Sequence, residues 1–321
     1  MMVDSAVLKS NMLGDPTQRV IDVWVPHGHD GCALPLLVDI VGFTAGGPAH
    51  TNWKNFGENL PERLDRLTAS GELPPVVVAF PDCFTKLGGN QYINSAAVGR
   101  WADFLLQEAV PAVEARFKTG GSGRRGLFGK SSGGYGAIAH ALLYPDFWSA
   151  AACHSGDMGF EWAYLPDFPS ALRSLARTRF DIKAWLDDFY SAKKVNDKDM
   201  HILMQLAMCA TYDPDPNAYM GIRLPVDFET CEVIPERWAN FMAWDPVVMA
   251  ETRGPGLKKL KALYIDCGDA DQYNLVYGAR RLHRMLQREN ISHVYEEFPD
   301  NHSSVDYRMD ISLPILAKAL S

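Results

Sequence analysis

The sequence predicts an α/β fold: a mostly parallel central sheet with helices on both faces and a largely helical insertion. Short apolar segments typical of buried strands alternate with helical patterns at both ends of the chain, and such alternation is typical of parallel sheets with crossover helices. Between Asp157 and Gly256 the strand signal disappears, and this interval is far longer than the connection that neighbouring strands need. We therefore expect one core formed by residues 1–156 and 257–321, and a cap or lid formed by residues 157–256.

The individual elements follow from hydrophobic periodicity and from turns rich in Gly and Pro. Strands are expected at residues 20–25, 35–42, 74–80, 148–154, 260–268 and 293–298, with a short one before Gly129. Core helices are expected at residues 59–67, 98–117 and 275–288, after Gly133, and at the end of the chain. Within the insertion, helical patterns cover residues 170–178, 182–193 and 199–210.

Composition and charge exclude several classes of protein. The 321-residue chain is 47% apolar and 22% charged, as is ordinary for globular proteins. Its net charge of −8 argues against a general nucleic-acid or anionic-membrane binder, because both classes use basic surfaces. No apolar run is long enough to span a bilayer, and the N-terminal residues lack the features of a secretion signal. A cytoplasmic location is therefore the default expectation, and the six scattered cysteines are expected to be reduced.

The stretch around Ser131 carries the strongest local signal. A short apolar run, Leu127-Phe128, passes into Gly129-Lys-Ser-Ser-Gly133 and then into a helical pattern. The pattern Gly-x-Ser-x-Gly at a junction between strand and helix is typical of a nucleophile elbow, whose strained turn presents the serine hydroxyl above the sheet. Glycine is needed at both ends of the motif because strand and helix pass close to the turn. Ser131 is therefore the candidate nucleophile.

The same residues also resemble the end of a phosphate-binding P-loop. That motif needs a glycine five residues before Gly129, where the chain has Arg124, and its long loop must follow the strand, whereas here the apolar run abuts Gly129 directly. The spacing therefore argues against a phosphate loop. A turn rich in Ser and Gly without chemistry is the other alternative, and residues further along the chain argue against it.

An acidic residue follows one late strand, and a histidine follows the last. Asp271 lies just after the strand expected at 260–268, and His302 just after the one at 293–298. The carboxyl ends of parallel strands converge at one edge of a sheet, so both side chains are expected to meet Ser131 there. The order Ser, Asp, His is that of α/β-hydrolases. Histidine can take the serine proton and return it to the leaving group, and the carboxylate orients it. From the residues alone, Asp269 remains an alternative acid.

A Gly-rich loop, Gly42 to Pro48, follows an inner strand and predicts an oxyanion hole. In α/β-hydrolases one amide of that hole comes from the loop after an early strand, and the other from the residue after the nucleophile. The backbone amides of Phe43 and Ser132 are therefore expected to face the developing oxyanion. A flexible loop without this role is the alternative.

Other histidines are assigned no chemistry. His154, at the end of an expected strand, is interpreted as a packed residue because His302 is better placed as a base. His27, His29 and Asp30 lie in an expected turn, and no further cluster at ligand spacing supports a metal site. No metal or organic cofactor is expected.

The quoted motifs resemble one family. Leu37-Val-Asp-Ile-Val-Gly-Phe43, Gly129-Lys-Ser-Ser-Gly-Gly-Tyr-Gly136, Gly268-Asp-Ala-Asp-Gln-Tyr273 and Asn301-His-Ser303 are similar to the esterase D-like, or putative esterase, family of α/β-hydrolases. That family includes S-formylglutathione hydrolases, feruloyl esterases and mycolyltransferases. The resemblance implies an acid three residues past a strand-ending glycine, which favours Asp271 over Asp269. Lys130 stands where relatives often have His, and the long cap is atypical of S-formylglutathione hydrolases, so a glutathione thioester is not the favoured substrate.

The sequence thus predicts a serine carboxylesterase acting on a small-molecule ester through an acyl-enzyme on Ser131. The alternatives are an acyltransferase that uses the same acyl-enzyme, and a non-catalytic binding protein on a hydrolase scaffold. The sequence also allows a homo-oligomer. The methionine and aromatic side chains of the cap are expected to form mainly the cap core, with some lining an apolar acyl or alcohol pocket. These residues are Phe160, Trp162, Tyr164, Phe168, Met204, Met208, Trp238, Phe241 and Trp244.

Overall fold

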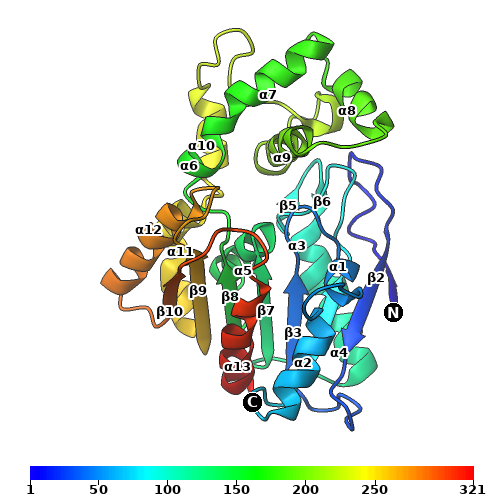
Figure 1. Ribbon diagram of the computed structural model, residues 1–321, viewed down its shortest axis with the longest axis vertical. Helices are drawn as coiled ribbons and strands as arrows, with labels where there is room; N and C mark the ends of the chain where they lie inside the picture. The colour runs from blue at the N-terminus through cyan, green and yellow to red at the C-terminus, as the bar shows by residue number, and fades with distance from the viewer.

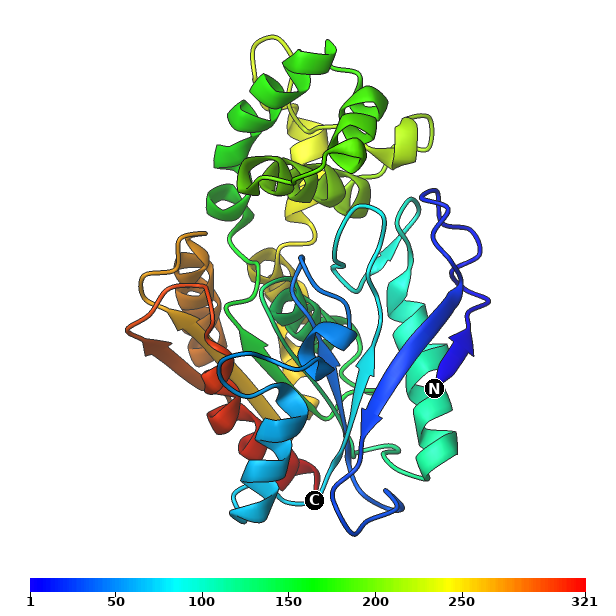
Figure 2. The same ribbon diagram turned by 45° about the vertical axis from the view of Figure 1, so that its right-hand side comes forward.

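The computed structural model describes residues 1–321 and has a twisted eight-stranded sheet at its centre (Figures 1 and 2). In spatial order the strands are β1 (Met2–Asp4), β2 (Gln18–Trp24), β4 (Val77–Pro81), β3 (Leu36–Ile40), β7 (Arg125–Lys130), β8 (Ala150–His154), β9 (Ala262–Gly268) and β10 (Val294–Phe298). Every neighbouring pair from β4 to β10 is parallel, whereas β2 is antiparallel to β4 and β1 to β2. The predicted α/β class with a mostly parallel sheet is therefore confirmed.

Helices cover both faces of this sheet, as expected. On one face α2 (Leu60–Ala69) and α13 (Met309–Leu320) bury their apolar sides. The other face carries the main hydrophobic core. The helices there are α3 (Trp101–Asp103), η1 (Phe104–Ala109), α4 (Val110–Phe117), α5 (Ser132–Leu143), α11 (Pro246–Arg253) and α12 (Leu275–Arg288). Two small elements complete the core: helix α1 (Pro48–Thr51) and the antiparallel pair β5 (Asn94–Ser95) and β6 (Gly99–Arg100).

Local sequence explains where α2 begins. The Asn59 side chain accepts a hydrogen bond from the Glu62 amide (2.8 Å), and the Glu62 carboxylate accepts one from the Asn59 amide (2.9 Å). Two amides that the helix leaves without a partner are thereby satisfied. The helix that the sequence predicts at 275–288 coincides with α12.

The helix expected at residues 98–117 is one continuous helical segment with a wider middle. It runs through α3, the π-helical η1 and α4. Pro111 lies at the start of α4 and has no amide hydrogen to donate. Just before it, the Val110 amide bonds to the Leu105 carbonyl five residues back, which is the π-helical pattern.

The insertion is largely helical, as the sequence predicts, and lies over the carboxyl ends of the parallel strands (Figures 1 and 2). Its elements are α6 (Phe160–Ala163), η2 (Leu165–Asp167), α7 (Phe168–Leu175), η3 (Ala176–Thr178), α8 (Ile182–Ser191), α9 (Asp197–Tyr212), η4 (Tyr219–Gly221) and α10 (Pro235–Met242). The following α11 and η5 (Gly254–Lys259) pack against α5 of the core. The division of the chain at residues 157 and 256 stays a prediction.

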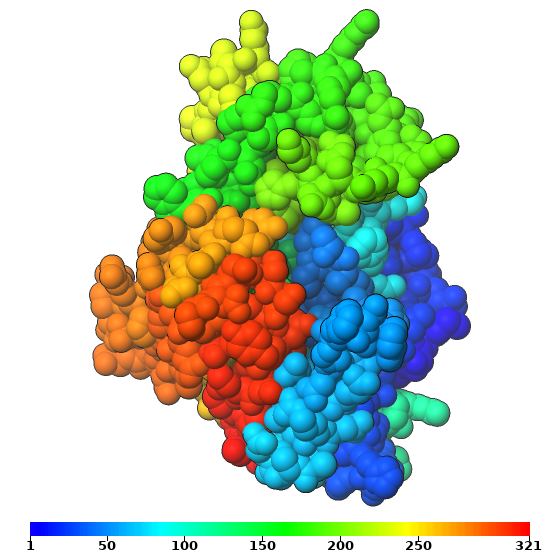
Figure 3. All heavy atoms as spheres, in the orientation of Figure 1, coloured from blue at the N-terminus to red at the C-terminus, as the bar shows by residue number.

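Contacts join the insertion to the core. The Ser95 hydroxyl of β5 donates to the Ala210 carbonyl of α9 (2.7 Å), and Arg281 of α12 pairs with Glu161 of α6. Figure 3 shows the insertion, in green and yellow, resting on core segments coloured orange, red and blue. No helix combines the length and the apolar composition needed to cross a bilayer.

Candidate active site

Ser131 occupies a strained turn between β7 and α5. Its backbone has φ +59° and ψ −125°, in the region that side chains rarely adopt. The chain can make this turn because both flanking glycines touch the neighbouring strand. A Cβ at Gly133 would lie 1.9 Å from the Ile40 carbonyl oxygen, and one at Gly129 would lie 2.2 Å from the same atom. The expected elbow geometry is therefore present, and glycine is obligatory at both positions.

His302 and Asp271 form a contact beside this turn. The His302 Nδ1 atom lies 2.7 Å from the Asp271 Oδ2 atom, and both residues are buried. The other Asp271 oxygen accepts the Tyr273 amide (2.9 Å), and the Tyr273 ring packs edge-on against the His302 ring at 4.8 Å between centroids. Asp269 is exposed and makes no contact with His302. The sequence alone left both Asp269 and Asp271 as candidates for the acid, and in the structure Asp271 pairs with His302.

The loop after β3 lies against Ser131. A Cβ at Gly42 would be 3.4 Å from the Ser131 Cβ atom, so the two backbones touch there. The Phe43 amide donates none of the backbone hydrogen bonds in the loops. Ser132 is the first residue of α5, so its amide has no partner within the helix. Both amides expected to form the oxyanion hole are thus free to bind an oxygen.

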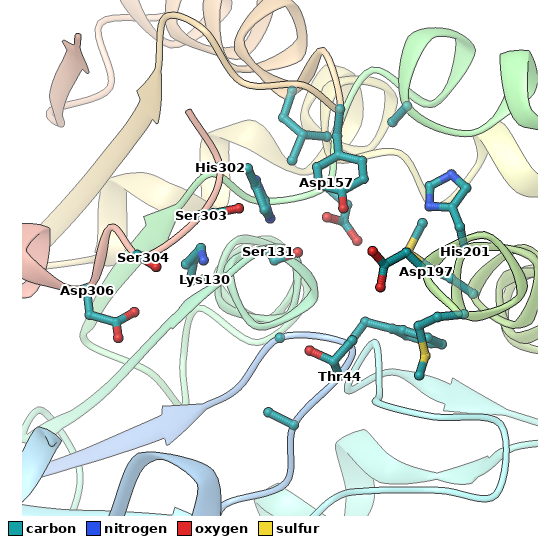
Figure 4. Close-up of a pocket in the computed structure, with 18 of the residues that line it drawn as sticks. Thr44, Lys130, Ser131, Asp157, Asp197, His201, His302, Ser303, Ser304 and Asp306 are labelled. Carbon is teal, nitrogen blue, oxygen red and sulfur yellow. The ribbon is translucent and has the colours of Figure 1, made fainter. Parts of the chain in front are cut away.

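A cavity of about 460 Å³ opens at this place and is lined by both Ser131 and His302 (Figure 4). It extends to both sides of Ser131. Figure 4 shows Asp157, Asp197 and His201 on one side of Ser131, and the insertion contributes to the lining Asp157, Ala163, Tyr164, Asp197, Met200, His201 and Met204. On the other side of Ser131 the figure shows Lys130, Ser303, Ser304 and Asp306, and His50, which also lines the cavity, lies near Asp306.

Comparison with known proteins assigns this arrangement to a family. A profile of the family described as putative esterase matches residues 25–313. The chain belongs to this family. It is accordingly an ester-hydrolysing enzyme, and the resemblance seen in its motifs is confirmed. No curated protein matches the sequence.

Several solved structures share the fold of this esterase. A ferulic acid esterase has 18% identity and a TM-score of 0.63, over 99% of this chain and 96% of its own. FphF, a fluorophosphonate-binding serine hydrolase of Staphylococcus aureus, has 15% identity and a TM-score of 0.59, over 100% and 97%. An S-formylglutathione hydrolase of Agrobacterium tumefaciens has 16% identity and a TM-score of 0.60, over 100% and 94%. At such identities the likeness shows the fold.

The esterase site contains a buried carboxylate to which the sequence analysis assigned no role. The Asp157 Oδ2 atom accepts hydrogen bonds from the Tyr164 hydroxyl (2.8 Å), the Ser132 hydroxyl (3.2 Å) and the Gln91 amide (3.3 Å). Burial raises the pKa of Asp157, and the hydrogen bond from Tyr164 and the nearby charge of His302 only partly oppose that rise. The only feature of the sequence that could have indicated a role for Asp157 is its position just after β8, the strand next to β7. Gln91 lies in a long loop and has no such feature.

His154 is a packed residue in this enzyme, as expected. Its Nδ1 atom lies 2.8 Å from the Asp266 carboxylate, and its Nε2 atom lies 2.8 Å from the Ser312 hydroxyl of α13. The side chain is buried and is not part of the cavity lining.

The side chains expected to form the core of the insertion or to line a pocket lie in different environments, and Trp162 does neither, because it is 54% exposed and lies outside the cavity lining. Phe160, Phe168, Met208 and Phe241 of the insertion are buried. Tyr164 and Met204 line the cavity.

Replacing Gly133 tests the close approach at the elbow. We expect Gly133→Ala to lower the free energy of unfolding by more than about 3 kcal/mol, because its methyl group would overlap a backbone carbonyl that cannot move freely. Gly254→Ala is the matched control, since a Cβ there meets no atom closer than 3.7 Å. Denaturant unfolding measures both variants, and equal midpoints for the two would contradict the steric argument.

Replacing Asp157 tests its raised pKa. Because the folded protein binds this proton more tightly than the unfolded chain does, wild-type stability contributed by Asp157 is lost as pH rises from an ordinary aspartate pKa of about 4 through the raised folded value. Asp157→Asn cannot ionise, so its melting temperature should gain on the wild type as pH increases from about 4 to 8. The exposed Asp146→Asn control should show no such trend. Parallel pH profiles of Asp157→Asn and wild type would refute the assignment.

Proposed function

We propose that this ester-hydrolysing enzyme is a serine carboxylesterase that works through an acyl-enzyme on Ser131. The observation that carries the proposal is that Ser131 and His302 line one cavity while the Nδ1 atom of the His302 ring lies 2.7 Å from Asp271. The three residues follow β7, β9 and β10, whose carboxyl ends share one edge of the sheet. A strained serine, a histidine and a buried carboxylate are the parts that acyl transfer to a hydroxyl requires.

In the first half-reaction, the Ser131 hydroxyl attacks the ester carbonyl carbon as its proton passes to the Nε2 atom of His302. The contact with Asp271 holds the proton on Nδ1, which leaves Nε2 free to accept. The resulting imidazolium lies beside a buried carboxylate and is stabilised by its charge. When the tetrahedral intermediate collapses, the imidazolium returns the proton to the leaving alcohol oxygen.

The carbonyl oxygen becomes negatively charged in the intermediate and needs donors that are already oriented. The amides of Phe43 and Ser132 are proposed to supply them, because both lie next to Ser131 and neither is used within its own element. The Ser132 amide also begins α5, so the positive end of the helix dipole adds to the stabilisation. Fixed backbone donors need no rearrangement when the charge forms.

The second half-reaction repeats these steps with water. His302 takes a proton from a water molecule, the hydroxide oxygen attacks the acyl carbon, and the bond to Ser131 breaks as the serine oxygen regains a proton. The cavity extends to both sides of Ser131, which gives the acyl and alcohol parts of the substrate separate places. Small-molecule esters fit its volume of about 460 Å³.

Removal of the nucleophile is the direct test. Ser131→Ala should keep the fold and lose ester hydrolysis by several orders of magnitude, as expected when a covalent nucleophile is deleted. A fluorophosphonate probe should label the wild type but not this variant. Ser170→Ala, at an exposed cap serine, is the control and should remain active and labelled. An active Ser131→Ala variant would rule out the proposed acyl-enzyme.

The two neighbouring aspartates offer a matched pair of substitutions. Asp271→Asn should lower kcat by about 10³- to 10⁴-fold, because it removes the charge that stabilises the imidazolium and disturbs the histidine tautomer. Asp269→Asn removes an exposed carboxylate two residues away and should change kcat by less than a few-fold. Steady-state kinetics of both variants on one ester distinguishes the two aspartates. The reverse pattern would assign the acid role to Asp269.

A further inference from the structure

Lys130 is an unpaired cation in the cavity wall. It ends β7, directly before Ser131, and lines the cavity on the side away from the insertion (Figure 4). Its ammonium group makes no hydrogen bond and no ion pair within 4.0 Å. The two carboxylates with most influence on it already have closer partners: Asp306 binds Lys54 at 2.7 Å, and Asp271 contacts His302 at 2.7 Å. Burial lowers the pKa of Lys130, because its charged form loses hydration and gains no ion-pair partner in return.

His50 lies on the same side of the cavity and has one free ring nitrogen. Its Nδ1 atom lies 2.5 Å from the Oδ2 atom of Asp39, which is fully buried in β3. Its Nε2 atom has no partner in the protein, and the ring lines the cavity. Burial acts to lower the pKa of His50, but the charge and hydrogen bond of Asp39 outweigh it, so the pKa is raised. When protonated, His50 therefore presents a second N–H donor to the cavity.

The charges around His50 leave an excess of positive charge at this end. Asp39 offsets His50, and Asp306 is bound by Lys54. Glu58 and Arg63, which also lie near His50, form their own ion pairs with Arg66 and Asp310. Lys130 is the charge that remains without a partner.

The opposite side of the cavity carries the opposite charge. The Asp197 carboxylate lines it on the side toward the insertion (Figure 4). An anionic group would be repelled there and attracted beside Lys130. The cavity is thus polarised along the direction in which an ester must lie across Ser131.

We propose that the end of the cavity formed by Lys130 and His50 recognises a carboxylate group of the substrate, so that the preferred substrates are esters carrying a free carboxylate. This inference rests on the proposed esterase function. The carboxylate belongs to the acyl part or to the alcohol part, at a short distance from the ester bond, because Lys130 adjoins the nucleophile in the chain. Charge-assisted hydrogen bonds from Lys130 and protonated His50 hold it.

Two matched pairs of esters test the proposal by proton release. Monomethyl glutarate is compared with methyl valerate for a carboxylate on the acyl part, and acetylated γ-hydroxybutyrate with butyl acetate for one on the alcohol part. In one of the two pairs, the wild type should prefer the carboxylate ester by at least about tenfold in kcat/KM, the range expected of charge-assisted hydrogen bonds. The pair that shows the preference identifies the part of the substrate that carries the carboxylate.

Substitutions of Lys130 then locate the cause of the preference. Lys130→Met should reduce the preference to about one, and Lys130→Arg should retain most of it. Lys130→Gln, which keeps polarity and loses charge, serves if the methionine variant fails to fold. Lys259→Met removes an exposed lysine that does not line the cavity, and it should leave the preference unchanged. A preference that survives loss of the charge at Lys130 would overturn the assignment.

Calorimetry on Ser131→Ala supplies a readout that does not depend on turnover. Monomethyl glutarate should bind this variant more tightly at pH 6 than at pH 8, because His50 is charged below its raised pKa and loses that charge as pH rises through it. The additional change His50→Gln should remove this pH dependence.

If the wild type hydrolyses all four esters with no preference in either pair, the carboxylate inference fails and the esterase proposal stands. If it hydrolyses none of them, the esterase proposal itself fails.

Discussion

The structure depends on one close approach, in which the backbones of β3, β7 and α5 meet around the Ile40 carbonyl. Two glycines permit it, since any side chain at Gly129 or Gly133 would overlap that oxygen. Two consequences follow for the intervening residues: Ser131 adopts a strained conformation and lines the cavity, and Ser132 directly after it begins α5. Packing of the core thus sets the position of the candidate nucleophile together with that of one proposed oxyanion donor.

The same turn is connected to the insertion through Asp157. A single carboxylate oxygen accepts from Ser132 in the elbow, from Gln91 in a core loop and from Tyr164 beside α6. A buried carboxylate is costly unless donors surround it, so donors from the elbow, the core loop and the insertion all contribute to stabilising it. A displacement of α6 would therefore disturb the contacts of Ser132, whose amide is proposed to bind the oxyanion.

The sequence predicts the parts of this site that depend on local pattern. The glycine spacing locates the elbow around Ser131, and the positions of Asp271 and His302 after late strands bring them to one edge of the sheet. What it does not predict depends on contacts between distant segments. The pairing of His50 with Asp39 and of Gln91 with Asp157 joins loops whose relative position no periodicity encodes. Strand β1 is three residues long, too short for an alternating pattern to be recognised.

The proposed roles of Ser131, His302 and Asp271 do not explain why Lys130 stands beside them, since its position has a cost in free energy. A partly buried ammonium without an ion pair loses hydration without gaining a partner, which destabilises the protein relative to an apolar residue of the same length. The elbow does not need it, since the steric requirement falls on Gly129 and Gly133. A bound carboxylate would provide the missing partner, while Asp197 disfavours the same anion at the other end. On this interpretation the charge distribution fixes the direction in which an ester lies across Ser131, and substrate choice is separable from the chemistry of bond cleavage.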